Sequence, residues 1–130
     1  MRITGTAVTL NVADVPASSE FLQKHFGFRE VMSADGFASL TREDAGMHIG
    51  YLAIGLPTLP ADFRDIGAAG VLVAFEVDDL PAEERRLRAE GVPITHETTV
   101  EPWGERFFQV TDPNGVIVQL VDWVRAKPTS

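Results

Sequence analysis

The side chains that could carry chemistry are few in this chain of 130 residues. It contains 3 histidines and no cysteine, which excludes thiol chemistry, disulfides and cysteine-bound zinc. The sequence also lacks a nucleophile elbow and a phosphate-binding glycine-rich loop. Asp78 and Asp79 look like a carboxylate pair, but Asp79 is better explained as the N-cap of a helix that begins Leu-Pro-Ala. The residues therefore give no complete catalytic constellation.

Two polar side chains stand at alternating positions of predicted strands and could act as an acid or a base. Because side chains alternate across a strand, His48 shares a face with Gly50, and Glu76 shares a face with Leu72. One interpretation is a metal pair completed by a third ligand such as His96. A second is a pair of polar pocket residues, and a third is half-exposed strand residues with no role. The spacing matches no known metal-ligand motif, which favours the second and third interpretations over the metal pair.

Aromatic side chains offer another kind of chemistry, the binding of flat rings. Residues 101–115 read EPWGERFFQVTDPNG and hold Trp103 between a proline and a glycine. The indole there either plugs a core edge or faces a ligand. Phe37 begins a predicted strand in the first half of the chain, and Phe107 and Phe108 are adjacent on another, so one of the two must face the concave side of its sheet. Stacking of a ring on such a residue contributes on the order of 1–3 kcal/mol per contact.

The elements that carry these side chains are predicted from a sequence pattern that occurs twice in the chain. Residues 8–17, VTLNVADVPA, and residues 73–82, VAFEVDDLPA, both alternate apolar residues and then continue with Asp, an aliphatic residue, Pro and Ala. Alternation predicts a strand with one buried face. Asp14 and Asp79 are the expected N-caps of the helices that follow, because proline is tolerated in the first turn of a helix.

The remaining elements also occur twice. Gly27 and Gly91 are expected to end the two helices, and a hairpin with a glycine-containing turn follows each of them. The sequence therefore predicts two β-α-β-β-β units, over about residues 1–54 and 71–125, with a Pro- and Gly-rich linker at about 55–70. We expect a single α+β domain in which these tandem units form a cup-shaped mixed sheet around a concave site.

Charge and hydropathy restrict the partners. The formal net charge of −8 argues against nucleic acid and anionic lipid, which both bind basic surfaces, and it suits a neutral or cationic small molecule. No apolar run approaches the roughly 20 residues that span a bilayer. The start MRITGTAVTL lacks the long apolar region of a signal peptide. Together with the absence of cysteine, these features lead us to expect a cytoplasmic protein.

The repeat and several motifs resemble the vicinal oxygen chelate superfamily, which includes glyoxalase I, extradiol dioxygenases and bleomycin resistance proteins. The similarity covers nearly the whole chain and lies in the motifs LNVADV, FGF, FEVDDL and DPNG. More narrowly, PWGERFFQVTDPNG is similar to the bleomycin resistance proteins, which carry Pro-Trp-Gly, an Arg, an aromatic residue, and then Asp-Pro and Gly. DGFASL resembles their segment that holds an early pocket aromatic. The resemblance thus implies the same tandem fold.

The enzymes of this superfamily bind one divalent metal through His or Glu on four strands, two from each repeat. By motif and internal repeat, the corresponding positions in this chain are Ala7, Gly50, Leu72 and Gln119. Ala, Gly and Leu offer no ligand atom, and Gln is a poor ligand beside a carboxylate. A divalent ion needs about three protein ligands to be held firmly. The resemblance therefore predicts neither a metal nor any other cofactor.

The resemblance to the bleomycin resistance proteins implies a non-catalytic protein that sequesters a planar aromatic antibiotic or natural product. Trp103 and Phe37 match the pair that would sandwich the planar part of such a drug. It also implies a homodimer with the ligand groove between subunits; Thr9 stands near the place of a first-strand proline linked to strand exchange, so exchange itself stays open. The predicted ligand-binding residues are Phe37, His48, Glu76, Trp103, Phe107, Phe108 and Gln119.

Two other functions remain open. An enzyme of the same superfamily (a lyase, isomerase or dioxygenase) with an atypical metal site or none would use His48 or Glu76 as its acid or base. A structural or interaction module would have a cup filled by its own side chains.

Overall fold

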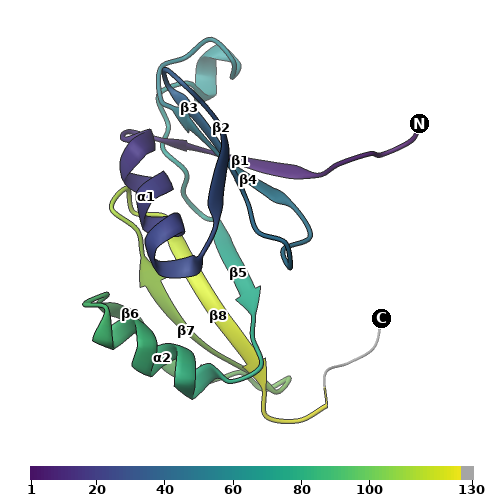
Figure 1. Ribbon diagram of the computed structural model, residues 1–130, viewed down its shortest axis with the longest axis vertical. Coiled ribbons are helices and arrows are strands. Elements are labelled where there is room, and N and C mark those ends of the chain that lie inside the picture. Colours follow the sequence, from purple (N-terminus) through teal and green to yellow (C-terminus); the bar gives the residue numbers. More distant parts are fainter. Residues whose placement is uncertain (127–130) are drawn as a thin grey trace. The chain divides into compact units, whose positions relative to one another are not determined.

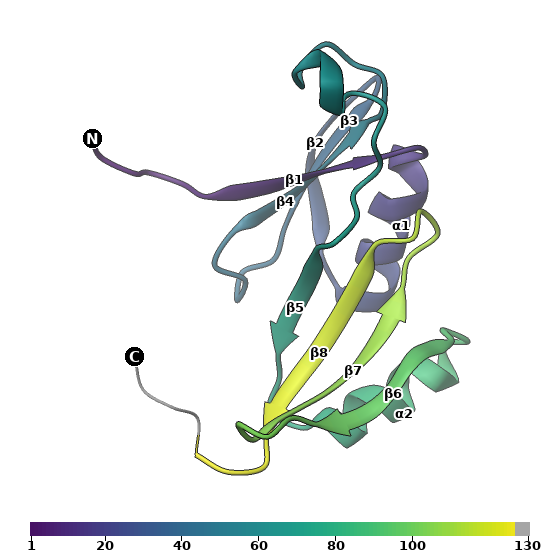
Figure 2. The same cartoon turned by 180° about the vertical axis from the view of Figure 1, so that it is seen from behind.

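The computed structural model describes residues 1–126, and the chain divides into two compact units with the boundary between Ala69 and Gly70. In chain order each unit consists of a strand, a helix and three further strands (Figures 1 and 2). This confirms the predicted α+β fold with a repeated βαβββ unit. The predicted linker spans about residues 55–70; residues 55–69 are grouped with the first unit and contain the short 3-10 helix η1 (Ala61–Phe63).

The first unit is a four-stranded mixed sheet in the order β1-β4-β3-β2. The first and last strands in sequence pair in parallel, and the other neighbours are antiparallel. Its helix packs against β3 and β4. The elements are β1 (Ala7–Val12), α1 (Val15–Phe26), β2 (Arg29–Ala34), β3 (Phe37–Thr41) and β4 (His48–Ala53).

Local signals fix both ends of α1. The side chain of Asp14 accepts a hydrogen bond from the backbone N–H of Ala17 at 3.1 Å, as an N-cap should, and Pro16 occupies the first turn. Gly27 ends the helix in the left-handed conformation, at φ 67°, where a β-carbon would be unfavourable. The predicted start and end of this helix are therefore confirmed.

The second unit repeats the topology, with the sheet order β5-β8-β7-β6. Its parallel pair is again formed by the first and last strands, and β8 is antiparallel to β7. Asp79 caps its helix as Asp14 caps α1, accepting from the N–H of Ala82 at 3.1 Å. The elements are β5 (Leu72–Glu76), α2 (Leu80–Ala89), β6 (Ile94–Val100), β7 (Glu105–Thr111) and β8 (Ile117–Trp123).

An ion pair fastens the N-terminus of α2 to its sheet. Arg106 donates to both carboxylate oxygens of Asp122, at 2.7 and 2.5 Å, and Asp122 Oδ2 also accepts the backbone N–H of Leu80 at 3.2 Å. The hydrogen bonds from Arg106 lower the pKa of Asp122 and outweigh the effect of burial, which raises it. Strands β7 and β8 and the start of α2 thus share one buried carboxylate.

Each sheet has one face covered by its helix and one face without a helix. In the first unit Leu10, Leu40 and Ile49 are buried on the helix side, so the alternate residues point to the helix-free face. In the second unit the bond between Leu80 and Asp122 places Asp122 on the helix side. None of the helices within residues 1–126 is long and apolar enough to cross a lipid bilayer.

Candidate functional site

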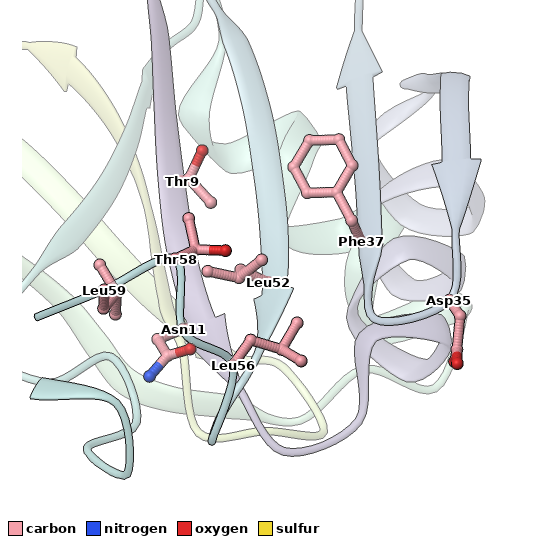
Figure 3. Close-up of a pocket in the computed structure, with 8 residues that line it drawn as sticks. All are labelled: Thr9, Asn11, Asp35, Phe37, Leu52, Leu56, Thr58 and Leu59. Carbon is pink, nitrogen blue, oxygen red and sulfur yellow. The ribbon is translucent and has the colours of Figure 1, made fainter. Parts of the chain in front are cut away.

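The first unit has a pocket on its helix-free face, with a volume of about 430 Å³ (Figure 3). Volumes of about 300–1,000 Å³ are usual for sites that hold small organic ligands. Strands β1, β3 and β4 form its floor, and the segment that follows β4 forms a wall. The lining residues are Thr9, Asn11, Asp35, Phe37, Leu52, Leu56, Thr58 and Leu59.

Phe37, which begins β3, gives this pocket an aromatic surface. It pairs with Leu52 across the β3–β4 ladder, and Leu52 pairs with Asn11 across the β4–β1 ladder. Residues paired in this way point to the same side of a sheet. Figure 3 shows the phenyl ring, Leu52 and Thr9 on this side, with Leu56 and Thr58 beside them.

Gly50 allows the pocket floor to close tightly. A β-carbon at this position would lie 2.8 Å from Thr9 Oγ1 and 3.5 Å from Cε1 of Phe37. The first distance is far below an ordinary contact, so any side chain here would push Thr9 aside. Ala7 stands at the start of the same strand as Thr9, opposite the exposed His48. The two positions of the first unit that would carry metal ligands therefore hold residues that do not fit a metal.

Asn11 joins the floor of the pocket to its wall. Its Nδ2 donates hydrogen bonds to the backbone carbonyls of Ile66 at 2.8 Å, Arg64 at 3.1 Å and Phe63 at 3.5 Å. Its backbone carbonyl accepts the N–H of Ala68 at 2.7 Å. The segment from η1 to Ala68 is thus fastened along β1, which places the preceding residues 56–59 against the sheet.

The second unit carries a polar network on its own helix-free face. Gln119 pairs with Ala74 in β5, as Gly50 pairs with Thr9 in β1, so the predicted equivalence of Gln119 and Gly50 holds in the register. Gln109 Nε2 donates to Gln119 Oε1 at 2.8 Å, and Gln119 Nε2 donates to Glu105 at 3.5 Å. The one metal-ligand position that holds a polar side chain is therefore engaged within the protein.

The structure assigns opposite sides to the two adjacent phenylalanines. Phe108 pairs with Leu120, two positions from Asp122, which places it on the α2 side; its side chain has no exposed surface and belongs to the core. Phe107 points to the helix-free face, where the ring of His96 lies with its centroid 5.1 Å away. Of the two predicted ligand-binding residues, Phe108 is a packing residue, and Phe107 lies on the helix-free face with only 6% of its surface exposed.

A second tryptophan, which sequence reasoning passed over, contacts a predicted site residue. Trp123 Nε1 donates to Glu76 Oε1 at 3.0 Å, between β8 and β5. Strand alternation could have found it, because Trp123 stands four residues after Gln119 on the same face. The exposed carboxylate of Glu76 is thus oriented by an indole.

Trp103 lies in the turn between β6 and β7, with 54% of its surface exposed. The turn closes through a hydrogen bond from the N–H of Gly104 to the carbonyl of Glu101 at 2.9 Å. Arg125 donates to the carbonyl of Pro102 and packs over Gly104, whose φ of 95° suits only glycine. The indole therefore stands outward on a braced turn and does not plug the core of its unit.

The remaining titratable residues in the described part of the chain form no metal centre. His48 is exposed, and His96 contacts the carbonyl of Glu97 through Nδ1 at 2.9 Å. Within residues 1–126, no three histidine, aspartate or glutamate side chains gather as a group that could hold a metal ion. The described donor set, the absent side chain at Gly50 and the hydrogen-bonded amide of Gln119 do not fit the divalent metal that the superfamily resemblance implies for its enzymes.

Sequence reasoning missed most of the pocket wall. Leu56, Thr58 and Leu59 stand in the stretch expected to be a linker, and nothing local shows that it folds back on β1. Asn11 carried a usable signal: it is polar in an apolar strand and shares a face with Thr9. Asp35 stands at the hairpin turn two residues before Phe37, so the prediction that Phe37 lies at a pocket could have been extended to it.

Comparison with known proteins places this geometry in a family. The model of the Glyoxalase/Bleomycin resistance protein/Dioxygenase superfamily matches residues 6–120. No curated protein sequence shows significant similarity to the chain. Among solved structures, a glyoxalase/bleomycin resistance protein/dioxygenase from Nocardioides is 24% identical, with a TM-score of 0.75 over 100% of this chain and 90% of that one.

Two further solved structures share the fold, and their names describe different functions. One is TnmS3, an antibiotic-binding protein from Streptomyces sp. CB03234, with 21% identity, a TM-score of 0.69, and coverage of 92% of this chain and 96% of that chain. The other is lactoylglutathione lyase from Agrobacterium tumefaciens, with 20% identity, a TM-score of 0.73, and coverage of 89% and 90%. At these identities the likeness concerns the fold alone.

Proposed function

The chain belongs to the glyoxalase/bleomycin resistance protein/dioxygenase superfamily, and from that premise we propose that it is a non-catalytic small-molecule-binding protein. Its ligand is a planar aromatic antibiotic or natural product, which the protein sequesters. We further propose that it acts in the cytoplasm as a homodimer with a ligand groove between subunits.

The observation that carries this proposal is the pocket beside Phe37. It combines a phenyl ring and three leucines with a few polar groups, and such a lining suits a flat apolar guest that is oriented by one or two hydrogen bonds. The ring packs over Gly50, at a position where the related enzymes require a metal ligand. The same replacement that removes a ligand atom thus gives room for the aromatic surface.

The rival proposal, an enzyme of the superfamily, finds less support in the described contacts. Its acid or base would be His48 or Glu76, and Glu76 accepts a hydrogen bond from Trp123. His48 pairs in register with Ala7, which offers no functional group to it. Gln119 is engaged by Gln109 and is no free ligand.

The proposal is tested by a thermal-shift screen of aromatic antibiotics, followed by calorimetric titration of each hit. A ligand that binds the folded protein must raise its melting temperature by mass action. We expect saturable, stoichiometric binding that is unchanged by EDTA, and recovery of the ligand chemically intact after prolonged incubation. Turnover of the ligand, or a stoichiometric divalent ion in protein purified without chelator, would favour the enzyme instead.

A further inference from the structure

We infer that the pocket of the first unit selects planar ligands whose ring edge donates a hydrogen bond to Oδ1 of Asn11. The inference rests on the proposed function and specifies its ligand: an aromatic compound with a ring N–H or a phenolic O–H. The relevant observation is a buried acceptor that the protein leaves unpaired at the wall of an apolar cavity.

The orientation of the Asn11 amide is fixed by its partners. Three backbone carbonyls, those of Phe63, Arg64 and Ile66, surround one end of the amide, and carbonyls can only accept hydrogen bonds. The donor Nδ2 must therefore face them, and rotation of the amide by 180° would set Oδ1 against three oxygens. Oδ1 consequently points to the other side, and in Figure 3 it is directed to the side on which Leu52 and Leu56 lie.

This oxygen is the one buried side-chain polar atom without a hydrogen-bond partner in the described part of the chain. Asn11 as a whole is only 8% exposed. Leaving a buried acceptor unpaired is costly, so proteins generally satisfy such groups. Asn11 lines the pocket while its Oδ1 has almost no exposed surface, so a ligand that slightly displaces a neighbouring lining side chain would reach this oxygen and satisfy it.

The other lining groups define the rest of the ligand. Phe37 and Leu52 offer an apolar surface for the face of a ring, while Thr9 and Thr58 add hydroxyl groups that can accept or donate. Asp35 is exposed at the hairpin turn and adds a negative charge to the lining. A cationic substituent on the ring is therefore favoured over an anionic one, in keeping with the formal net charge of −8.

A site with a buried acceptor discriminates strongly against a ligand that brings another acceptor. When oxygen replaces an N–H of the ring, the hydrogen bond is lost and two lone pairs face each other. The ring area and the stacking on Phe37 are unchanged by that replacement. The donor requirement can therefore be measured separately from ring binding.

The experiment compares two ligands of the same shape on the full chain. Tryptamine carries an indole N–H, and 3-(2-aminoethyl)benzofuran carries an oxygen in its place; both are cations at neutral pH. Calorimetry gives the two dissociation constants, and ¹⁵N–¹H correlation spectra locate the site through the side-chain amide of Asn11. We expect tryptamine to bind at least about fivefold more tightly and to shift the Asn11 amide resonances.

A pair of matched variants assigns the ring contact. Phe37→Leu should weaken both compounds to a similar degree and leave their ratio intact, because it removes stacking and keeps the acceptor. Met32→Leu is the control, since that methionine is 61% exposed in β2 and does not line the pocket. It should leave both affinities unchanged.

The outcomes separate the two proposals. Equal binding of both compounds, with resonance shifts at Phe37, would overturn the donor requirement and leave aromatic binding in place. Binding of neither compound, while an antibiotic from the screen binds without shifting the Asn11 amide, would also overturn the inference and not the proposed function. If no aromatic compound binds at all, both proposals fail.

Discussion

Oγ1 of Thr9 lies 2.8 Å from the point that a β-carbon on Gly50 would occupy. The two residues are paired across the parallel strands β1 and β4, so the contact belongs to the floor of the pocket. A glycine is thus required here by the approach of a neighbour and not by its own backbone angles. The absence of a side chain at residue 50 thus removes a possible metal-ligand atom and also leaves room for Thr9 and the ring of Phe37.

The first prediction concerns this contact. Gly50→Ala should lower the free energy of unfolding by about 1 kcal/mol, because the new methyl group forces Thr9 out of its position. The double variant Thr9→Ala/Gly50→Ala should recover most of the loss, and a double-mutant cycle in urea measures the coupling. Independent, additive effects of the two substitutions would show that the hydroxyl and the methyl group do not compete for space.

The second prediction concerns the fastening of the pocket wall. Asn11→Ala removes the amide that holds the carbonyls of residues 63, 64 and 66, and it should destabilise the first unit by about 1–3 kcal/mol. Hydrogen exchange should accelerate most at the N–H groups of Gly55 and Ala68, which are bonded to Arg64 and to Asn11 itself.

Thr9→Ala is the matched control for this experiment, since Thr9 is the neighbouring residue on the same face of β1. It should leave exchange in residues 55–68 unchanged. Uniform acceleration across both units after Asn11→Ala would contradict a local role for the amide in holding the wall.

The third prediction follows from the ion pair between Arg106 and Asp122. Since Arg106 lowers the pKa of Asp122 in the folded protein, the folded state holds this proton less tightly than the unfolded state does. The pair therefore stabilises the fold above the unfolded pKa of about 3.9, and the stabilisation is lost as pH falls through the lower folded pKa.

Asp122→Asn tests this directly. At neutral pH it should cost about 1–3 kcal/mol of unfolding free energy, because charge-assisted hydrogen bonds become neutral ones. The difference from the parent should shrink as the pH is lowered from about 5 towards 2. Asp44→Asn is the comparison, since Asp44 also has a lowered pKa beside Arg42 but is fully exposed, and it should change stability little at any pH. A cost of Asp122→Asn that does not vary with pH would rule out the linkage.

The fourth prediction concerns Trp103. Because the indole is 54% exposed, Trp103→Ala should leave the melting temperature within a few degrees of the parent. It should weaken an aromatic ligand found in the screen by at least about tenfold, the loss of one aromatic contact. Val100→Ala, at a residue 53% exposed on the neighbouring strand, is the control and should bind normally.

Fluorescence provides a second readout for the same residue. The chain has 2 tryptophans, so the titration is made in a Trp123→Phe background where Trp103 is the sole indole. Quenching of the remaining emission by the ligand is expected. Unaltered affinity in Trp103→Ala, with emission that does not respond to a bound ligand, would remove Trp103 from the site.

Much of the fold was predictable because its signals are local. The alternation before Asp14 and Asp79, the two caps, and Gly27 depend on residues a few positions apart, and each recurs in the structure. The equivalence of Gly50 and Gln119 was also accessible, since a repeat carries its register with it. Placement of Phe107 and Phe108 needed the register of β7, which alternation within a single strand does not supply.

The pocket was less predictable because a non-local contact builds it. Residues 56–59 look like a linker when only Pro and Gly content is considered, and their position depends on an amide located more than 40 residues earlier in the chain, Asn11. Alternation from Gln119 indicates the face of β8 on which Trp123 stands, but its hydrogen bond to Glu76 depends on the pairing of β8 with β5, which is not local in the sequence. Sequence patterns therefore located the strands well and the wall poorly.

The double engagement of Asn11 limits how this site can diversify. One end of its amide secures main-chain oxygens and the residue also lines the cavity, so a substitution that alters ligand preference at residue 11 also loosens the wall. The side chains of three other residues line the cavity but take no part in the hydrogen bonds from Asn11 that hold the wall: Leu56, Thr58 and Leu59. We expect laboratory evolution towards a new guest to accumulate changes at those three residues while leaving Asn11 alone.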